Sequence, residues 1–446
     1  MNLLNISALD IARMIARKEI TVVEVVEFYI HRIKKYENLD CISVLFETEA
    51  REHAKQLDKL NIATKRLSQF HGIPILLKDN LDVKGYVTKA GTVYLDQIAQ
   101  ESCALVRQLE SLGFVILGKV KMTELAFGLS GQNPMQGTPH NPWSKQQLAP
   151  GGSSSGASVA VAAGLCPLSI GGDTGGSIRT PTALNGIFGF KPSSNRFVAT
   201  GAVPLSKTLD TFGPIALRSE DIFELYALLS NTQIPQFRSN LNKLYYLAEE
   251  DFPYPLDDEV LDLWKKLLTQ LTASGFVLKK WKPPTEFNFE ALSDRTSMII
   301  AYESYLYHGK DAENVHTKMW EVVRERVLRG KNISLENYQE VVAQRGSFEQ
   351  IFEQSLIEEE SLLLPVSPIF AVKLDAQDKN FAHVGDYTRP FNYLDSPCFS
   401  FPIGSSSTNL PVGVQLVSYR GNDHLLLEQA QAIISRLNIK PEVADI

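Results

Sequence analysis

Two short turns, each a pair of glycines followed by a serine, carry the residues best suited to chemistry. They are Gly151-Gly152-Ser153 and Gly175-Gly176-Ser177, and ten of the chain's 28 glycines lie between residues 151 and 190. Glycine lets a backbone come close to another chain segment or to a bound molecule. A serine on such a turn, beside backbone N–H groups, has the layout of a nucleophile next to an oxyanion hole. The segment is therefore predicted to attack a carbonyl group.

A flexible linker is the usual explanation of a segment rich in glycine and serine. Here the two turns enclose apolar runs: residues 157–163 are typical of a buried helix of small side chains, and residues 167–170 of a short buried strand. A linker would not hold apolar segments between its glycines. An ordered site is therefore expected.

A second catalytic motif overlaps the first turn. Residues 152–156 fit the G-x-S-x-G nucleophile elbow, which would make Ser154 the nucleophile. That motif needs an acid and a histidine later in the chain, and neither His383 nor His424 lies in a distinctive sequence setting. Partial matches to serine- and aspartic-protease motifs at residues 172–176 each lack an essential partner.

Several motifs in order along the chain resemble the amidase signature family. Ser153 and Ser177 lie 24 residues apart, as the two serines of that family do, and residues 71–80 resemble its strand-plus-lysine motif with Lys78 as the lysine. The resemblance is dense from about residue 61 to 235 and moderate from about 361 to 430. Further landmarks agree with it, namely residues 116–119, 141–143, 189–192 and 410–416.

The resemblance implies a catalytic set of Lys78, Ser153 and Ser177. Ser177 would be the nucleophile, Lys78 the base, and Ser153, following a cis peptide bond in the family, the relay between them. The oxyanion would be held by the backbone N–H groups of Thr174, Gly175, Gly176 and Ser177. No metal and no organic cofactor is implied.

The lysine must be neutral if it is to accept a proton. A free lysine has a pKa near about 10.4, and burial can lower that pKa by several units. Lys78 directly follows the apolar run of residues 73–77, which suits a buried position. The alternative, on generic burial statistics, is a lysine at a strand end that reaches solvent.

Other residues are expected to support the site. Gly152 would minimise the side-chain clash of a cis peptide bond before Ser153, and Asp173 and Arg179 are expected to brace the second turn by hydrogen bonds. By alignment with the family, the acyl pocket would be lined by Phe127, Gly128 and Leu129.

Two further residues are candidates for substrate recognition. Tyr338 and Arg345 lie on one expected helix, where they would either recognise a polar or carboxylate-bearing substrate or form a solvated helix face. Residues 389–397 resemble a family motif but have Asp395 where glycine is usual. That difference leaves the shape of the local pocket open.

The family resemblance implies an α/β fold, a single large domain with a central mixed twisted β-sheet covered on both sides by α-helices. Local patterns agree: a capping box at residues 21–24 begins an amphipathic helix, residues 74–77 and 114–117 are typical of strands, and residues 102–109 of a helix. We expect an N-terminal helical segment (1–60), the signature core (61–235), a variable helical, substrate-specific region (236–360) and the C-terminal part of the core (361–446).

Charge and composition narrow the class of partner. The 446 residues carry a formal net charge of −7, which argues against a nucleic-acid surface. The four cysteines are scattered without a C-x-x-C pair, so neither a zinc site nor a disulfide framework is indicated. No run of 18 apolar residues and no signal peptide is apparent, so a cytoplasmic protein without a membrane partner is expected. A homodimer is compatible with the sequence.

Three functions remain compatible with these features. The first is an amidase that hydrolyses the C–N bond of a small carboxylic amide to an acid and ammonia or an amine, through an acyl-enzyme on Ser177. The second is the glutamine-hydrolysing A subunit of a tRNA-dependent amidotransferase, which usually carries a tyrosine-rich run where only Tyr338 and Arg345 correspond here. The third is a catalytically idle scaffold with the same fold.

Overall fold

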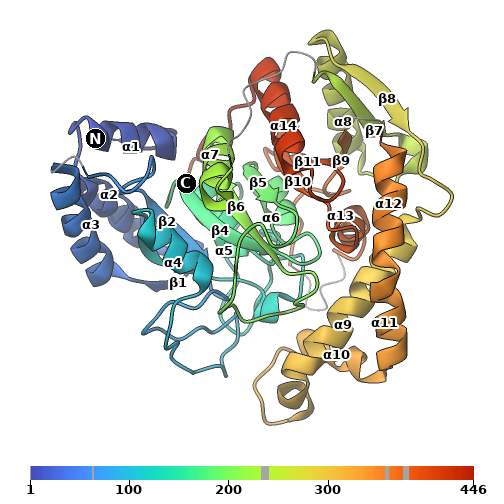
Figure 1. Ribbon diagram of the computed structural model, residues 1–446, viewed down its shortest axis with the longest axis horizontal. Helices are drawn as coiled ribbons and strands as arrows, with labels where there is room; N and C mark the ends of the chain where they lie inside the picture. Colours follow the sequence, from blue (N-terminus) through green and yellow to red (C-terminus); the bar gives the residue numbers. More distant parts are fainter. Residues whose placement is uncertain (1, 63–64, 233–240, 357–360, 375–380) are drawn as a thin grey trace.

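Short apolar runs distributed along the whole chain pair into one mixed β-sheet. The computed structural model describes residues 2–446 except 63–64, 233–240, 357–360 and 375–380, and within this part the sheet has eleven strands. Their order is β1-β3-β2-β4-β6-β5-β10-β11-β9-β7-β8. Helices flank this sheet, in agreement with the α/β prediction (Figure 1). Strands that are far apart in the sequence are neighbours at its centre.

The strands are short, and those at the centre of the sheet are buried along their whole length. Their bounds are β1 (Ile42–Leu45), β2 (Pro74–Lys78), β3 (Val115–Val120), β4 (Leu168–Asp173), β5 (Phe188–Lys191), β6 (Thr211–Ala216), β7 (Lys243–Leu247), β8 (Val277–Trp281), β9 (Ser361–Pro365), β10 (Cys398–Ser405) and β11 (Pro411–Val417).

The helices have these bounds: α1 (Ala8–Ala16), α2 (Val22–Lys35), α3 (Glu47–Ile62), α4 (Ala104–Ser111), α5 (Ser155–Ala162), α6 (Arg179–Asn185), α7 (Ser219–Ser230), α8 (Asp258–Ala273), α9 (Phe289–Glu313), α10 (Glu321–Leu328), α11 (Leu335–Ala343), α12 (Arg345–Ser355), α13 (Val384–Tyr393) and α14 (Asp423–Leu437). Short 3-10 turns include η2 (Glu124–Ala126) and η4 (Arg329–Asn332).

The strands that matter most for the site are β2 and β4. β2 pairs in parallel with both β3 and β4, while β4 pairs antiparallel with β6. Parallel strands in the middle of a sheet are covered on both faces and are therefore nearly all apolar. β2 has the sequence Pro-Ile-Leu-Leu-Lys, so its only charged residue is the last one, Lys78.

Several local predictions are confirmed. The capping box of α2 is present, because the Thr21 hydroxyl accepts the Glu24 N–H and the Glu24 carboxylate accepts the Thr21 N–H. The small-residue helix is α5, which packs against β2, β3, β4 and β6. Every residue of α5 is buried, which explains why it carries alanine, serine and valine only, apart from one glycine.

The region expected to be helical after residue 236 is only partly so. It contributes β7 and β8 to the edge of the sheet before α9–α12 begin. β8 is largely exposed, with lysines at two of its five positions, so its sequence lacked an apolar signal. Figure 1 shows α9, α10 and α11 together at one end of the molecule, beyond α13.

The expected segment boundary at residue 60 does not coincide with the end of a helix or strand. The boundary at residue 60 falls inside α3, which continues to Ile62. The boundaries near residues 235 and 360 lie outside the described residues. Across the described chain, no helix combines the length and the apolar character needed to cross a membrane.

Candidate active site

The candidate site lies where two parallel strands end. Because β2 and β4 are parallel neighbours, their carboxyl ends meet at one edge of the sheet, the usual location of a binding site in α/β folds. Lys78 is the last residue of β2 and Asp173 the last of β4. The turn that contains Ser153 precedes α5, and the turn that contains Ser177 joins β4 to α6.

Lys78 is buried, with 1% of its surface exposed. Its Nζ donates to Ser153 Oγ at 2.7 Å and to the Gly172 carbonyl at 3.1 Å, both of which are neutral acceptors. Burial lowers the pKa of Lys78 to about 7, although the more distant charges of Asp210 and Asp173 act in the opposite direction. A substantial fraction of this amine is therefore neutral near pH 7.

A second buried lysine on the adjacent strand shows what a structural lysine looks like in this fold. Lys119 on β3 is as deeply buried as Lys78, but its Nζ lies 3.3 Å from Asp79 Oδ1 and donates to Thr88 Oγ1 at 2.7 Å. Its charge is thus matched by a buried carboxylate. Lys78 instead contacts a hydroxyl and a carbonyl, which suits a group that exchanges a proton.

The peptide bond between Gly152 and Ser153 is cis. A side chain at position 152 would have no room, because a Cβ atom there would lie 2.6 Å from the Gly131 nitrogen and 3.1 Å from the Gly128 carbonyl oxygen. Only glycine fits such a close approach between backbones. Ser153 is fully buried, with its hydroxyl held by Lys78.

Ser154, the nucleophile of the alternative elbow motif, faces a different environment. Its hydroxyl donates to the Gly172 carbonyl at 3.0 Å and accepts the Gly172 N–H at 3.1 Å. The side chain therefore ties the first turn to β4 and is fully buried. It is not among the residues that line the adjacent cavity.

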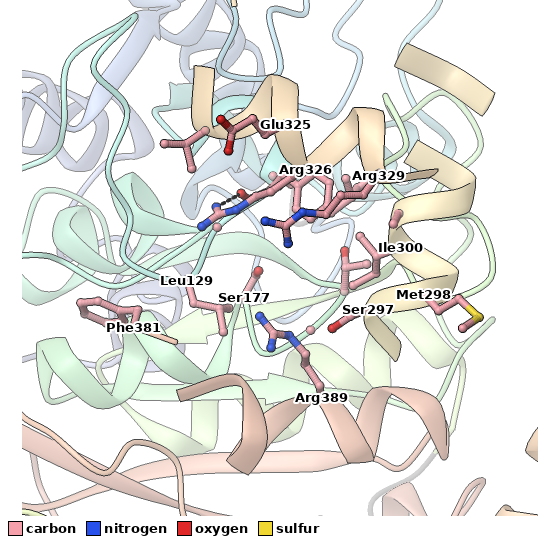
Figure 2. Close-up of a pocket in the computed structure, with 18 of the residues that line it drawn as sticks. Leu129, Ser177, Ser297, Met298, Ile300, Glu325, Arg326, Arg329, Phe381 and Arg389 are labelled. Atoms are coloured by element: carbon pink, nitrogen blue, oxygen red, sulfur yellow. Dashed lines mark hydrogen bonds between the residues drawn. The ribbon is translucent and has the colours of Figure 1, made fainter. Parts of the chain in front are cut away.

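The two serine turns are held together by the backbone. The Ser154 N–H donates to the Ser177 carbonyl at 3.1 Å. Ser177 lines the cavity together with Thr174 and Gly175 (Figure 2), whereas Ser153 and Lys78 are not among the lining residues. Of the three expected catalytic residues, Ser177 is therefore the one that borders the cavity.

Asp173 and Arg179 form a buried ion pair beneath the second turn. Arg179 Nη2 lies 3.0 Å from Asp173 Oδ1, and both side chains are fully buried. The Asp173 carboxylate also accepts the N–H groups of Gly176 at 2.8 Å and Ile178 at 3.1 Å. Burial alone would raise the pKa of Asp173, but the Arg179 charge and the side-chain hydrogen bonds from Arg179 and Asn392 hold that pKa well below its usual range. These contacts match the bracing role expected of the pair.

One expected oxyanion donor is engaged elsewhere. The Gly176 N–H, which we expected to face the oxyanion, instead donates to Asp173 Oδ1. The reason is that the Asp173 carboxylate, at the end of β4, points toward the backbone of the loop that follows this strand. The other backbone N–H groups expected in this role belong to Thr174, Gly175 and Ser177, which line the cavity.

Helix α13, in the C-terminal part of the chain, also holds the loop that contains Ser177. Thr388 Oγ1 donates to the Gly175 carbonyl at 2.7 Å, and Asn392 Nδ2 donates to Asp173 Oδ1 at 2.8 Å. Arg179 in turn donates to the Thr388 carbonyl and to Gln415 Oε1 on β11. The serine loop is therefore fixed by residues more than 200 positions later in the chain.

Asp210 is a member of the site that was not predicted from the sequence. Its Oδ1 accepts the Thr174 hydroxyl at 2.5 Å, and its Oδ2 accepts the N–H groups of Leu205 at 2.9 Å and Ser206 at 3.1 Å. Burial raises the pKa of Asp210 to about 6. In the sequence, Asp210-Thr211-Phe212 does not supply the second motif that an aspartic protease needs, and the position of Asp210 directly before β6 was the available signal.

The cavity in front of Ser177 has a volume of about 1220 Å³. Phe127, Gly128 and Leu129 line it, where the acyl pocket was expected. Its opposite walls come from α9, α10 and η4, which belong to the region expected to be substrate-specific, and from α13. These walls contribute apolar side chains such as Met298, and the arginines shown in Figure 2.

Tyr338 and Arg345 do not line this cavity. The Tyr338 hydroxyl donates to Glu303 Oε1 at 2.6 Å, which ties α11 to α9. Arg345 Nε donates to the Tyr393 carbonyl at 2.8 Å, which ties α12 to the end of α13. Both side chains therefore form hydrogen bonds that link neighbouring helices.

Asp395, the departure from the family's usual glycine, adopts a left-handed backbone with φ of 50°. Aspartate is one of the few residues besides glycine that reach this region readily. Its carboxylate accepts the Ser194 N–H at 2.8 Å and lies 3.0 Å from Arg420 Nε. Asp395 is not among the residues that line the cavity.

The acidic, histidine and cysteine side chains form no metal site in the part of the chain that the structure describes. No group of three or more of them is placed there to bind a metal ion. Four free, buried cysteines occur: Cys41, Cys103, Cys166 and Cys398.

Comparison with known proteins adds the following matches. The model of a protein family described as Amidase matches residues 24–427. The A subunit of the glutamyl-tRNA(Gln) amidotransferase of Protochlamydia amoebophila is 27% identical, over 99% of this chain and 98% of its own. The protein of the same name from Synechococcus sp. is 30% identical over 91% of each chain. A solved structure titled "Crystal structure of amidase" superposes with a TM-score of 0.88 at 29% identity, covering 96% of this chain and 99% of that one.

Breaking the buried Asp173–Arg179 ion pair is expected to destabilise the protein strongly. Asp173→Asn removes the buried negative charge and leaves the Arg179 guanidinium buried without its carboxylate. Breaking one partner of a buried pair costs about 3–5 kcal/mol. We expect the free energy of unfolding, measured by denaturant titration, to fall by about that amount.

The matched control is Asp10→Asn, which breaks the exposed Asp10–Arg13 pair, where both side chains are more than half exposed. An exposed pair contributes at most about 1 kcal/mol. Equal losses in the two variants would show that the buried pair does not brace the fold.

Proposed function

The chain belongs to the amidase signature family, and on this premise we propose that it is an amidase that hydrolyses the C–N bond of a carboxylic amide. The products would be a carboxylic acid and ammonia or an amine. The observation that carries the proposal is the hydrogen bond from the buried Lys78 to Ser153, whose turn is bonded through the Ser154 N–H to Ser177, a residue that lines the cavity. A neutral amine placed so is a base for a serine nucleophile.

The first chemical step forms a tetrahedral intermediate on Ser177. Ser177 Oγ attacks the amide carbonyl carbon, while its proton passes to Ser153 Oγ and the Ser153 proton passes to Lys78 Nζ. The carbonyl oxygen becomes an oxyanion, which the N–H groups of Thr174, Gly175 and Ser177 stabilise. Preorganised donors of this kind are worth about 10²–10³-fold in rate for each one.

The second step releases the amine. The C–N bond breaks as the Lys78 ammonium returns a proton through Ser153 to the leaving nitrogen, which leaves a Ser177 ester. Water then attacks that ester and gives its proton through Ser153 to Lys78. Collapse of the second tetrahedral intermediate returns that proton to Ser177 and frees the acid. Every proton taken up by the relay is thus given back.

The similarity to the A subunits of glutamyl-tRNA(Gln) amidotransferases supports a second candidate, the glutamine-hydrolysing A subunit of an amidotransferase. In this chain, Tyr338 and Arg345, the two positions that correspond to that subunit's tyrosine-rich run, make contacts between helices away from the cavity. Ammonia release from simple amides by the isolated chain favours the first candidate. Glutamine hydrolysis that requires a second, co-purified polypeptide favours the other.

A serine-directed probe tests the nucleophile. Wild-type protein is expected to form a covalent adduct with a neutral fluorophosphonate, and Ser177→Ala is expected to abolish the adduct while keeping the fold. The readout is the mass of the labelled peptide, with circular dichroism as the check on folding.

Ser154→Ala provides the comparison, because the nucleophile-elbow motif places the reaction there. Labelling is expected to persist in that variant. An adduct that survives in Ser177→Ala but disappears in Ser154→Ala would reverse the assignment.

The relay role of Ser153 predicts different losses for amides and esters. Ser153→Ala should lower kcat on an amide by about 10²–10⁴-fold, because positioned proton transfer is worth that much. The matched ester should lose less, because an alkoxide leaves with less need of a proton than an amine does. Hydrolysis rates for an amide and an ester of the same acid measure this difference.

Ser155→Ala, at the first residue of α5 and equally buried, is the control and should change the amide-to-ester ratio only a few-fold. Equal losses on both substrates in Ser153→Ala would exclude the relay.

A further inference from the structure

Three arginines share the cavity in front of Ser177. Arg389 comes from α13, Arg326 from α10 and Arg329 from the first position of η4. Figure 2 shows Arg389 on one side of Ser177 and the other two on the opposite side, with their side chains directed into the space between. None of these side chains was predicted from the sequence to bind a substrate.

Arg389 lies directly against the serine loop. A Cβ atom placed on Gly175 would lie 3.4 Å from Arg389 Cγ and 3.9 Å from its Nε, both within van der Waals contact. The guanidinium rests over Gly385, where a Cβ atom would lie 2.3 Å from Cζ. Its Nη1 also lies 3.5 Å from Ser293 Oγ on α9. Because Gly175 and Gly385 have no side chains, the Arg389 side chain can lie against the loop that contains Ser177.

Arg326 and Arg329 face Arg389 from the variable region. Arg326 Nη1 donates to the Phe127 carbonyl at 2.6 Å, which fixes the side chain against the expected acyl pocket (Figure 2). Arg329 begins the turn that follows α10 and is exposed to the cavity mouth. The cations therefore come from separate elements, and the cavity lies between them.

Among the described residues that line the cavity, the acidic ones lie toward its outside. Glu321 is 72% exposed and lies 3.4 Å from Arg324, which is not in the lining. Figure 2 shows the Glu325 carboxylate beyond Arg326, on the side away from Ser177. Asp294 is exposed on α9. The inner part of the cavity, next to the nucleophile, is thus flanked by arginine.

These observations identify a substrate class, an inference that rests on the proposed amidase function. A guanidinium stays protonated at any relevant pH and matches a carboxylate by paired hydrogen bonds. Apolar walls such as Ile300 and Phe381 limit the water that would otherwise weaken such a contact. A volume of about 1220 Å³ also exceeds what a simple aliphatic amide fills.

We propose that the substrate is an amide that carries a carboxylate, and that Arg389, with Arg326 and Arg329 opposite, binds this group while Ser177 attacks the amide. The carboxylate can stand on the acyl part or on the amine part of such a substrate. Both share the same recognition chemistry, and the experiment separates them.

The experiment measures binding, so that it does not depend on turnover. Titration calorimetry with Ser177→Ala compares butyranilide with two carboxylated counterparts: succinanilic acid, charged on the acyl side, and para-butyramidobenzoate, charged on the amine side. One charged compound is expected to bind about 10–100-fold more tightly than butyranilide, the gain expected for a hydrogen-bonded charged pair. The compound that gains identifies the side.

Arg389→Gln, made in the same background, should remove most of that gain. Gly385→Ala should reduce it as well, because the added methyl displaces the Arg389 guanidinium without removing its charge. Arg295→Gln is the control: Arg295 also lies on the cavity-facing helix α9 but stacks on Phe348 and does not line the cavity. It should keep the full preference.

Equal affinity for charged and neutral compounds, or a preference that survives Arg389→Gln, would overturn the proposal. So would the absence of measurable binding by either carboxylated amide. Failure of the amidase proposal is recognised separately, by the absence of a fluorophosphonate adduct on Ser177 in the wild-type chain.

Discussion

The site depends on one constraint, the burial of the Lys78 amine with no carboxylate among the described residues hydrogen-bonded to it. β2 carries the lysine to the centre of the sheet, and the small residues of α5 pack over the strands on either side. Desolvation is the largest effect on its pKa, and the Ser153 hydroxyl and the Gly172 carbonyl satisfy its hydrogen bonds without adding charge. Lys119, one strand away and paired with Asp79, shows that the fold can bury a lysine with a counter-ion when chemistry does not require otherwise.

The serine loop needs a rigid support, and distant segments provide it. Asp173 at the end of β4 binds Arg179 at the start of α6, and Asn392 on α13 and Gln415 on β11 complete the network. A buried carboxylate that accepts backbone N–H groups and a guanidinium fixes the loop from below, while Thr388 fixes Gly175 from the side. The C-terminal part of the chain thus acts on the site without contributing to the proposed proton relay, and through Arg389 it also forms part of the cavity wall.

The elements at the centre of the sheet could be predicted from the sequence, because their signals are local. The apolar run before Lys78, the small residues of α5 and the Thr21–Glu24 capping box each predict a structure that forms. β8 was missed because an exposed edge strand with lysines lacks an apolar pattern. Asp210, Arg326 and Arg389 were missed for a different reason: each acts through contacts across the fold, and no spacing in the sequence reports them. The engagement of the Gly176 N–H by Asp173 likewise depends on how the loop turns back on itself.

The most direct test of Lys78 as the base is the pH dependence of kcat/KM for a neutral amide substrate. Lys78 can accept a proton only when it is neutral, so protonation at low pH must abolish activity. With its pKa lowered to about 7 by burial, kcat/KM should rise about tenfold per pH unit below that value and reach a plateau above it. A rate that continues to rise until about pH 10, where an ordinary lysine loses its proton, would contradict the account. So would the same acid limb persisting in residual activity of Lys78→Ala.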